Sequence, residues 1–176
     1  MDFQSVTSVK NAKTNIKIVQ QAIYQKLPVL EPFPPLDTIN GNIMDALVYS
    51  LMKNVQVDII TSSPGGGYGS QVSSEFIYTQ LLQKIINNGV NEPVAIKQLD
   101  QYLKIGEAAY KKGGKPSKNH SKFWMVDDEI FYVGSHNFYP SPLHQFGVIV
   151  ESKEASEIFN KVFFEPILAN AKIYKK

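Results

Sequence analysis

The chain has 176 residues and a formal net charge of +2, with 18 lysines, no arginine and no cysteine. At about 150 residues per domain this length predicts a single domain. A composition of 43% hydrophobic and 19% charged residues excludes disordered and fibrous proteins. The lack of cysteine excludes disulfides, thiolate metal sites and cysteine nucleophiles. The lack of arginine excludes sites that need a guanidinium fork.

The N-terminus has neither a basic start nor an apolar run, so the sequence as given predicts no signal peptide. No apolar stretch approaches the roughly 20 residues of a transmembrane helix. Localisation therefore stays unknown, and secretion remains open if the chain is part of a longer precursor.

Apolar periodicity alternates between helix and strand along the first 90 residues. It predicts helices over 3–12, 43–54 and 72–87 and strands over 16–23 and 55–60. Gly89 is typical of a residue that ends the third helix. This order predicts an α/β fold, with a mixed sheet flanked by helices on both faces.

The segments between these elements predict loops. Four prolines favour a loop over 27–37, and the glycines of 62–70 favour another. Residues 94–103 fit a strand, with helix as the alternative from residue 98. The lysines and glycines of 106–118 predict a mobile, solvated loop.

Residues 119–137 predict a β-hairpin, with strands over 123–126 and 130–133. If the first strand reaches back to His120, its imidazole and the Lys122 ammonium share one face, because side chains alternate along a strand. The second strand leads to Ser135 and Asn137.

This hairpin collects one proton-transfer group, one cation and two neutral donors. The set suits a phosphodiester: its non-bridging oxygens need donors, while a histidine attacks phosphorus or protonates the leaving oxygen.

The pattern His120-x-Lys122-x4-Asp127-x6-Gly134-Ser135-x-Asn137 resembles the HKD motif of the phospholipase D superfamily, with every defining position filled. Residues 138–140 and 146–152 are similar to the segment after the second motif in secreted bacterial phospholipases D. The resemblance covers most of the chain and implies one phospholipase D-like α/β/α domain over 1–176, with one motif over 120–137.

The resemblance also implies roles for these residues. His120 matches the histidine of the second motif, a general acid and then base. Lys122, Ser135 and Asn137 would bind phosphate oxygens, and Asp127 would anchor the motif loops. Neither a metal nor a cofactor is implied.

In that family two motifs meet across a twofold interface, and one histidine forms a phosphohistidine. Only one motif is present here. A homodimer partner, or a second half outside this chain, would have to supply the other.

Gln145 departs from the family pattern. The secreted phospholipases place an acidic side chain there to hold the catalytic histidine. A neutral amide can orient an imidazole but cannot stabilise imidazolium as a carboxylate does. Glu151 is six residues further on, roughly 20 Å along a strand, and is a poor substitute.

Several other residues allow two interpretations. His136 occupies the variable motif position and is interpreted as a loop or substrate-contacting residue, and His144 as a residue near the site entrance. Trp124 favours the core over a substrate groove. The glycine-rich loop lacks the ending of a nucleotide-binding loop. The lysines of 111–118 predict a solvated loop that could also attract anionic lipid or nucleic acid.

Three hypotheses follow. The first is a phospholipase D-like phosphodiesterase that acts on phospholipid headgroups at a membrane surface. The second is a small homodimeric endonuclease of the same superfamily, with nucleic acid as its partner. The third, motivated by Gln145 and the single motif, is a non-catalytic remnant or binding module.

Overall fold

The computed structural model describes residues 3–26, 37–39, 41–64, 72–112, 115–138 and 145–176. Its centre is a seven-stranded sheet with the strand order β10–β9–β8–β1–β4–β5–β11. These strands are β1 (Asn15–Gln20), β4 (Gln56–Ser62), β5 (Leu103–Ala108), β8 (Lys122–Val126), β9 (Ile130–Gly134), β10 (Gly147–Glu151) and β11 (Ala171–Ile173).

The sheet is mixed, as predicted. Strands β1, β4 and β5 run parallel, whereas β8 pairs antiparallel with β1, and β9, β10 and β11 also join antiparallel. Two short hairpins lie outside this sheet: β2 (Tyr24–Lys26) with β3 (Asp37–Ile39), and β6 (Tyr110–Lys112) with β7 (Lys115–Ser117).

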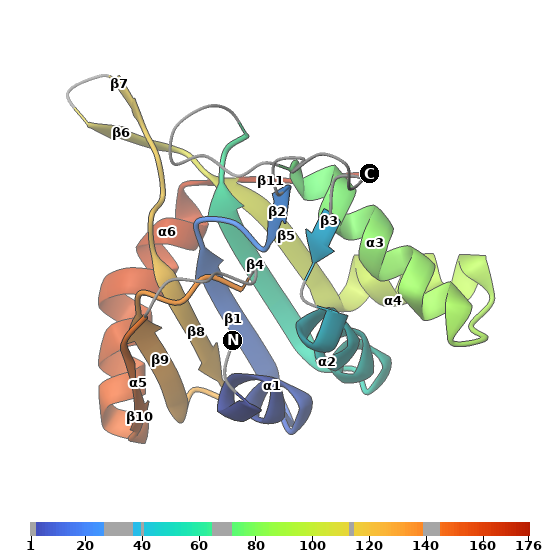
Figure 1. The fold of residues 1–176 in the computed structure, drawn as a ribbon, viewed down its shortest axis with the longest axis horizontal. Coiled ribbons are helices and arrows are strands. Elements are labelled where there is room, and N and C mark those ends of the chain that lie inside the picture. Colours follow the sequence, from blue (N-terminus) through green and yellow to red (C-terminus); the bar gives the residue numbers. More distant parts are fainter. Residues whose placement is uncertain (1–2, 27–36, 40, 65–71, 113–114, 139–144) are drawn as a thin grey trace, which may run out of the picture.

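Helices cover both faces of the sheet, which confirms the predicted architecture (Figure 1). One face packs against α1 (Phe3–Lys10), α2 (Gly41–Met52), α3 (Ser74–Asn87) and α4 (Glu92–Tyr102). The other packs against α5 (Lys153–Phe159), the π-helix η1 (Asn160–Phe164) and α6 (Glu165–Ala169). The last three elements continue one another along the chain.

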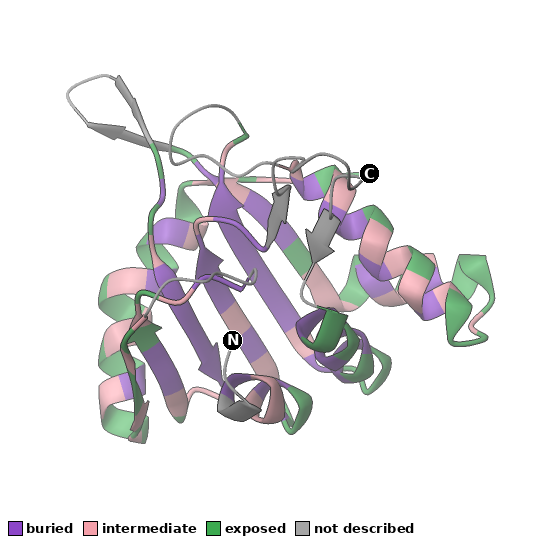
Figure 2. Cartoon of the chain, viewed as in Figure 1, coloured by how far each residue is buried: buried purple, intermediate pink, exposed green. Residues whose placement is uncertain are grey.

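Two apolar cores result, one on each face. Ile18 and Ile59 belong to the core under α1–α4, whereas Val19 and Ile60 belong to the core under η1 and α6. Adjacent residues of a strand point to opposite faces, so β1 and β4 are apolar on both sides. Figure 2 shows the central strands as buried.

The prediction of a strand over 94–103 is wrong, because this segment forms α4. Ala95 and Leu99 are fully buried four residues apart, which is helical spacing. Pro93 lies in the first turn, where its missing N–H costs nothing. The strand begins only at Leu103.

The predicted loop over 106–118 is also wrong for much of its length, because β5 continues to Ala108 and β6 and β7 form a hairpin. Strands β2, β3 and β11 and the helices after residue 152 were not predicted from the sequence. The glycine-rich segment 65–71, residues 27–36 and His144 lie outside the described residues. In the described parts of the chain, no helix is both long and apolar enough to span a bilayer.

Candidate active site at the carboxyl end of the parallel strands

Most of the polar motif side chains gather at one end of the central strands, which we call the active-site edge. Strands β1, β4, β5 and β9 end there and β8 begins there (Figure 1). Ligands of open α/β sheets commonly bind at the carboxyl ends of the parallel strands. His120 and Lys122 lie at this edge, whereas Asp127 lies at the far end of β8.

Lys122 is the first residue of β8 and is buried. Its ammonium donates to Oε1 of Gln21 at 3.0 Å and to the carbonyl oxygen of His120 at 2.8 Å. Desolvation lowers the pKa of Lys122 to about 8. An ammonium has three N–H donors, so one more can serve an anion.

A strand that reaches back to His120 is not formed, because β8 begins at Lys122. His120 therefore lies before β8, and its side chain is exposed. Together with one backbone hydrogen bond from the Gln21 N–H to the Ser121 carbonyl oxygen at 2.9 Å, the buried side chain of Asn119 holds residues 119–121. Its Nδ2 donates to the carbonyl oxygen of Gln20 at 3.1 Å, and its Oδ1 accepts from the Ser121 N–H at 3.0 Å. The sequence reading missed this support.

Desolvation and, to a smaller extent, the neighbouring Lys122 ammonium lower the pKa of His120. Both effects disfavour the imidazolium. In the free protein the lowered pKa favours the neutral imidazole, which is the form that accepts a proton or attacks phosphorus.

A polar row crosses the sheet beside Lys122. Gln20 pairs with Lys122 on one side and Thr61 on the other, and Thr61 pairs with Glu107. Register partners share a face of the sheet. Gln20 and Thr61 are fully buried, and their side-chain polar atoms have no hydrogen-bond partner within the described part of the chain. Sequence reasoning missed this row because register between distant strands has no local signal.

Ser135 and Asn137 follow β9. The Ser135 hydroxyl donates to the carbonyl oxygen of Phe146 at 3.1 Å and accepts from the Phe146 N–H at 2.9 Å. It joins β9 to the segment before β10, so binding a phosphate would require the hydroxyl to exchange this partner. Asn137 is buried.

Two further predicted residues flank the site. Gln145 is half-buried and lies two residues before β10. His136 lies between Ser135 and Asn137, and its Nδ1 is 3.0 Å from the Tyr132 hydroxyl. Trp124 is buried in the core under α1–α4, as favoured from the sequence.

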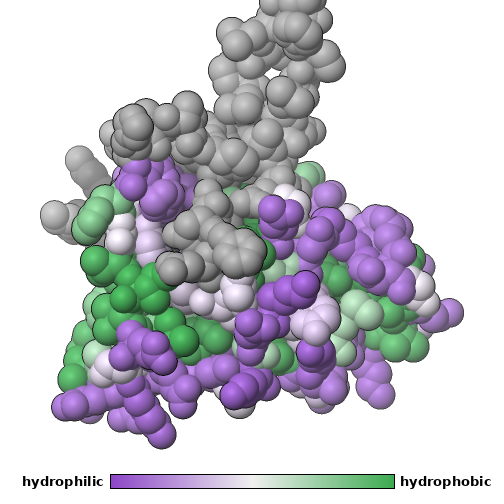
Figure 3. Space-filling model, turned by 60° about the horizontal axis from the view of Figure 1, so that its bottom comes forward, coloured by the Kyte–Doolittle hydropathy of each residue, from purple (hydrophilic) through white to green (hydrophobic). Residues whose placement is uncertain are grey.

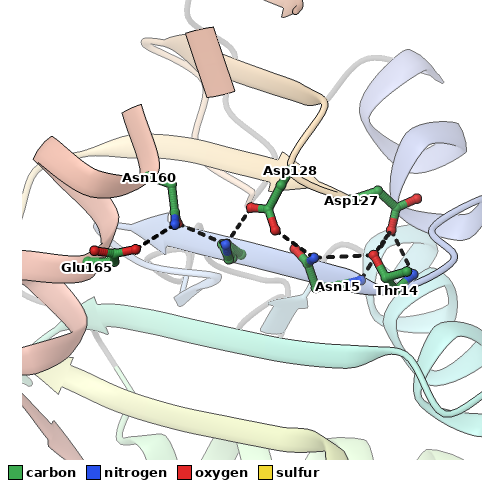
Figure 4. Close-up of polar contacts among 7 residues, drawn as sticks. Thr14, Asn15, Asp127, Asp128, Asn160 and Glu165 are labelled. Atoms are coloured by element: carbon green, nitrogen blue, oxygen red, sulfur yellow. Dashed lines mark hydrogen bonds and ion pairs between the residues drawn. The ribbon is translucent and has the colours of Figure 1, made fainter. Parts of the chain in front are cut away.

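Asp127 lies in the β8–β9 turn and binds the segment that enters β1 (Figure 4). Its carboxylate accepts from the N–H groups of Lys13 at 3.0 Å, Thr14 at 2.7 Å and Asn15 at 3.2 Å, and from the Thr14 hydroxyl at 2.9 Å. Burial alone would raise the pKa of Asp127, but these hydrogen bonds outweigh it and hold the pKa below its ordinary value.

A second polar chain ties the same turn to η1. Asp128 accepts from Nζ of Lys17 at 2.5 Å, and the same ammonium donates to Oδ1 of Asn160 at 2.8 Å. Asn160 in turn donates to Glu165 at 2.9 Å. Figure 4 shows this line of contacts passing between the β8–β9 turn and the helices. The far end of the motif hairpin is thus fixed on both faces of the sheet.

Strand β10 forms one edge of the sheet and exposes apolar side chains on both faces. Val148, which pairs with Val133, is 48% exposed, and Ile149 on the opposite face is 38% exposed. Phe146, just before the strand, is 77% exposed. Figure 3 shows apolar side chains gathered on the left of the molecule, where β9 and β10 lie in Figure 1. We call Val133, Phe146, Val148 and Ile149 the apolar edge.

Residues 6–166 match the family model described as "Cardiolipin synthase, PLD-like domain". The chain is also 30% identical over 170 residues to a phospholipase D of Streptomyces antibioticus. That alignment covers 90% of this chain but only 30% of the relative. The chain therefore spans less than a third of the length of this curated relative.

Solved structures with the same fold include three bacterial proteins. Nuc from Salmonella typhimurium, a phospholipase D family member, superposes with a TM-score of 0.61 at 16% identity, covering 98% of this chain and 90% of its own. NucT from Helicobacter pylori gives 0.59 at 15%, covering 96% and 87%. Phosphatidylserine synthase from Haemophilus influenzae gives 0.58 at 12%, covering 97% and 36%.

Proposed function

Because the chain belongs to the phospholipase D-like family, we propose that it is a phosphodiesterase unit that hydrolyses or transfers phospholipid headgroups. The observation that carries the proposal is the placement of His120 next to the buried ammonium of Lys122 at the carboxyl end of the parallel strands. The identity to a Streptomyces phospholipase D supports a lipid substrate.

In the proposed reaction, a histidine of a second motif attacks phosphorus and forms a P–N bond, while the P–O bond to the leaving alcohol breaks. His120 gives its proton to that alcohol oxygen. It then takes a proton from water or an acceptor alcohol, whose oxygen displaces the histidine and restores both side chains.

His120 must be protonated for the first step although its pKa is lowered in the free protein. A phosphodiester carries a negative charge, and an opposite charge nearby favours imidazolium. Substrate binding would thus charge His120 just before it acts as an acid. Lys122 would neutralise a non-bridging oxygen, with Ser135 and Asn137 as further donors.

Gln145 fits this scheme as a residue that orients the His120 ring. Its amide cannot stabilise imidazolium, so the charge of the bound phosphate becomes the main source of that stabilisation.

The second motif would come from another copy of the chain, or from another half. The apolar edge supports such a partner, because an uncovered edge strand with apolar side chains on both faces is typical of an interface.

A second candidate is a small homodimeric endonuclease. It is favoured by the basic stretch before the motif, where Lys118 donates to the carbonyl oxygens of Ser63 and Pro64 at the same edge of the sheet. Comparing cleavage of plasmid DNA with hydrolysis of phospholipid vesicles separates the two candidates.

The main test replaces His120. We expect His120→Ala to reduce choline release from phosphatidylcholine vesicles by about 10³-fold or more, since it removes the proton-transfer group. Lys97→Ala, an exposed lysine on α4, is the matched control and should retain activity. Release at the wild-type rate by His120→Ala would refute the assignment. A phosphatidyl adduct on His120, trapped at neutral pH and found by mass spectrometry, would exclude a non-catalytic binding module and would mean that the attacking histidine is His120 of another copy of the chain.

A further inference from the structure

Tyr132 is a buried aromatic residue at the centre of β9, and its hydroxyl reaches toward the active-site edge. Its ring stacks on Trp124, with centroids 5.9 Å apart and planes at 9°. The hydroxyl contacts His136, which follows β9 at that edge. Neither contact was expected from the sequence.

Two glycines make room for this side chain. Gly134 and Gly147 are register partners on β9 and β10. A Cβ atom on Gly147 would overlap the Tyr132 ring, and one on Gly134 would overlap the Tyr132 hydroxyl and approach the Gly147 Cα within 2.6 Å. The Tyr132 ring therefore leans along the sheet across both glycines instead of standing upright on β9. A lean of this kind carries the hydroxyl from the core to the motif residues.

The Tyr132 hydroxyl makes two contacts with His136. Its oxygen accepts from the backbone N–H of His136 at 3.2 Å and lies 3.0 Å from Nδ1. A neutral imidazole has one donor nitrogen and one acceptor nitrogen. With the ring proton on Nε2, the hydroxyl donates to Nδ1 while its oxygen accepts from the backbone N–H. The other tautomer would direct two N–H donors at the same oxygen.

We propose that His136 presents its Nε2–H as a neutral donor to the phosphate of the substrate, and that Tyr132 is the residue that positions it. This proposal rests on the proposed phosphodiesterase function. The variable position of the motif thus becomes a substrate-binding position in this chain.

Location supports the proposal. His120 lies two residues before β8 begins and His136 lies two residues after β9 ends, so both lie at the same end of the β8–β9 hairpin. Both histidines adjoin the end of β8 where the Lys122 ammonium is buried.

Electrostatics supports a neutral donor in particular. A second ammonium near His120 would lower its pKa further and hinder proton donation. An Nε2–H donor binds a phosphate oxygen without adding charge, and the hydrogen bond that Nδ1 would accept from the Tyr132 hydroxyl opposes the protonation that the phosphate favours. The chain contains no arginine that could do so with a fixed fork.

The first measurement is the protonation of the imidazole by ¹⁵N NMR on the whole chain. We expect Nε2 of His136 to carry the proton in the wild type, and the Nε2–H resonance to shift when inorganic phosphate is added. Tyr132→Phe keeps the ring but removes the hydroxyl, so it should give a mixture of the two neutral tautomers. Gly147→Ala displaces the ring without changing either partner and should have the same effect.

The second measurement uses two amide substitutions. The Gln amide nitrogen reaches the position of Nε2, whereas the Asn amide nitrogen reaches only that of Nδ1. With bis(4-nitrophenyl) phosphate, we expect His136→Asn to raise KM about tenfold, the scale of one lost hydrogen bond to a charged group. His136→Gln should stay within about threefold of the wild type, and kcat should change little in both variants.

The outcomes separate this proposal from the proposed function. A proton on Nδ1 in the wild type, no phosphate-induced shift, or equal KM values for the Gln and Asn variants would overturn the role of His136. If His120→Ala releases choline from phosphatidylcholine vesicles like the wild type, the catalytic assignment fails. The tautomer and phosphate titration still decide the role of His136, because neither depends on turnover.

Discussion

The carboxylate of Asp127 receives hydrogen bonds from four donors on Lys13, Thr14 and Asn15, more than 110 positions earlier in the chain. It lies at the end of β8 away from His120, so its contacts support structure at a distance from the chemistry. Asp127 and Asp128 both adopt a φ of 55°, in the left-handed region where aspartate is better tolerated than most residues. Aspartates therefore suit this turn for two reasons: they tolerate its backbone conformation, and their carboxylates accept the hydrogen bonds.

We expect Asp127→Asn to lower the free energy of unfolding at pH 7 by about 2 kcal/mol, because an amide cannot accept all of these hydrogen bonds. The pKa of Asp127 is lowered in the folded protein. Its contribution is therefore complete above the ordinary carboxyl pKa and is lost as pH falls through the folded value. Urea titrations at pH 7 and pH 3 measure the difference between wild type and variant, which should shrink at pH 3.

Glu129→Gln is the matched control, since Glu129 is an exposed residue of the same turn. It should change stability by less than about 0.5 kcal/mol. Equal losses for the two variants would mean that the turn responds to charge in general and not to the Asp127 hydrogen bonds.

Lys122 gives the site a pH limit. Because its pKa is lowered to about 8, the ammonium loses its proton at a pH where an ordinary lysine keeps it. We expect kcat/KM for bis(4-nitrophenyl) phosphate to fall as pH rises above about 8, since an uncharged amine attracts the phosphate less. Lys122→Arg keeps its charge throughout this range. We expect this variant to be less active than the wild type, but its kcat/KM should not fall above about pH 8. A fall at the same pH in this variant would assign the titration to another group.

At the scale of the elements, the buried polar side chains of Gln20 on β1 and Thr61 on β4 lower the free energy of unfolding, and they lie close to the site. Both polar atoms of the Gln20 side chain are buried without a partner among the described residues, and so is the Thr61 hydroxyl. A buried unpaired polar group costs about 1–3 kcal/mol. Such costs are common where function requires polar groups in place of a continuous core.

We expect Gln20→Met, which conserves the shape of the side chain, to raise the free energy of unfolding by about 1 kcal/mol. Gln21→Met is the neighbouring control. It removes the oxygen that accepts from Lys122 at 3.0 Å, so it should not stabilise the protein. Urea denaturation of the two variants tests this, and a Gln20→Met variant less stable than wild type would show that the amide is satisfied in solution.

The motif hairpin could be predicted from the sequence because its signals are local. Apolar strands on either side of a polar turn give β8 and β9 within a few residues. The segment 94–103 was misread because Val94 and Ile96 alternate as in a strand, whereas the buried residues are Ala95 and Leu99. In this segment the pattern of apolar residues alone did not identify which side chains are buried in the folded protein.

The support of the site could not be predicted, because it depends on contacts between distant segments. Asn119 holds the residues around His120 through the carbonyl group of Gln20. Tyr132 reaches His136 only because Gly147, on another strand, leaves room. The placement of Trp124 in the core followed from its residue type, but its stacking with Tyr132 depends on strand register.

At the scale of the whole molecule, the single motif makes assembly the central question. We expect sedimentation velocity to give a dimer under conditions where hydrolysis is observed. Val148→Asp, on the apolar edge, should shift the mass toward the monomer and lower specific activity, because it places a charge in the proposed interface.

Val94→Asp on α4 is the matched control, because both valines are about half exposed, at 56% for Val94 and 48% for Val148. It should leave mass and activity unchanged. A monomer with full activity would refute the requirement for a second copy, and an inactive monomer would direct the search to a separate partner half.

The position of β8 also determines when this fold can be completed during synthesis. Strand β1 is made early and can pair with β4 on one side, but its other edge must wait for residues 122–126, about a hundred positions later. Until then the ribosome-bound chain has an open edge on an apolar strand, which other chains can pair with. The segment that carries His120 and Lys122 therefore also protects the nascent sheet. Termination of translation before β8 would therefore yield a fragment prone to aggregation as well as one without a site.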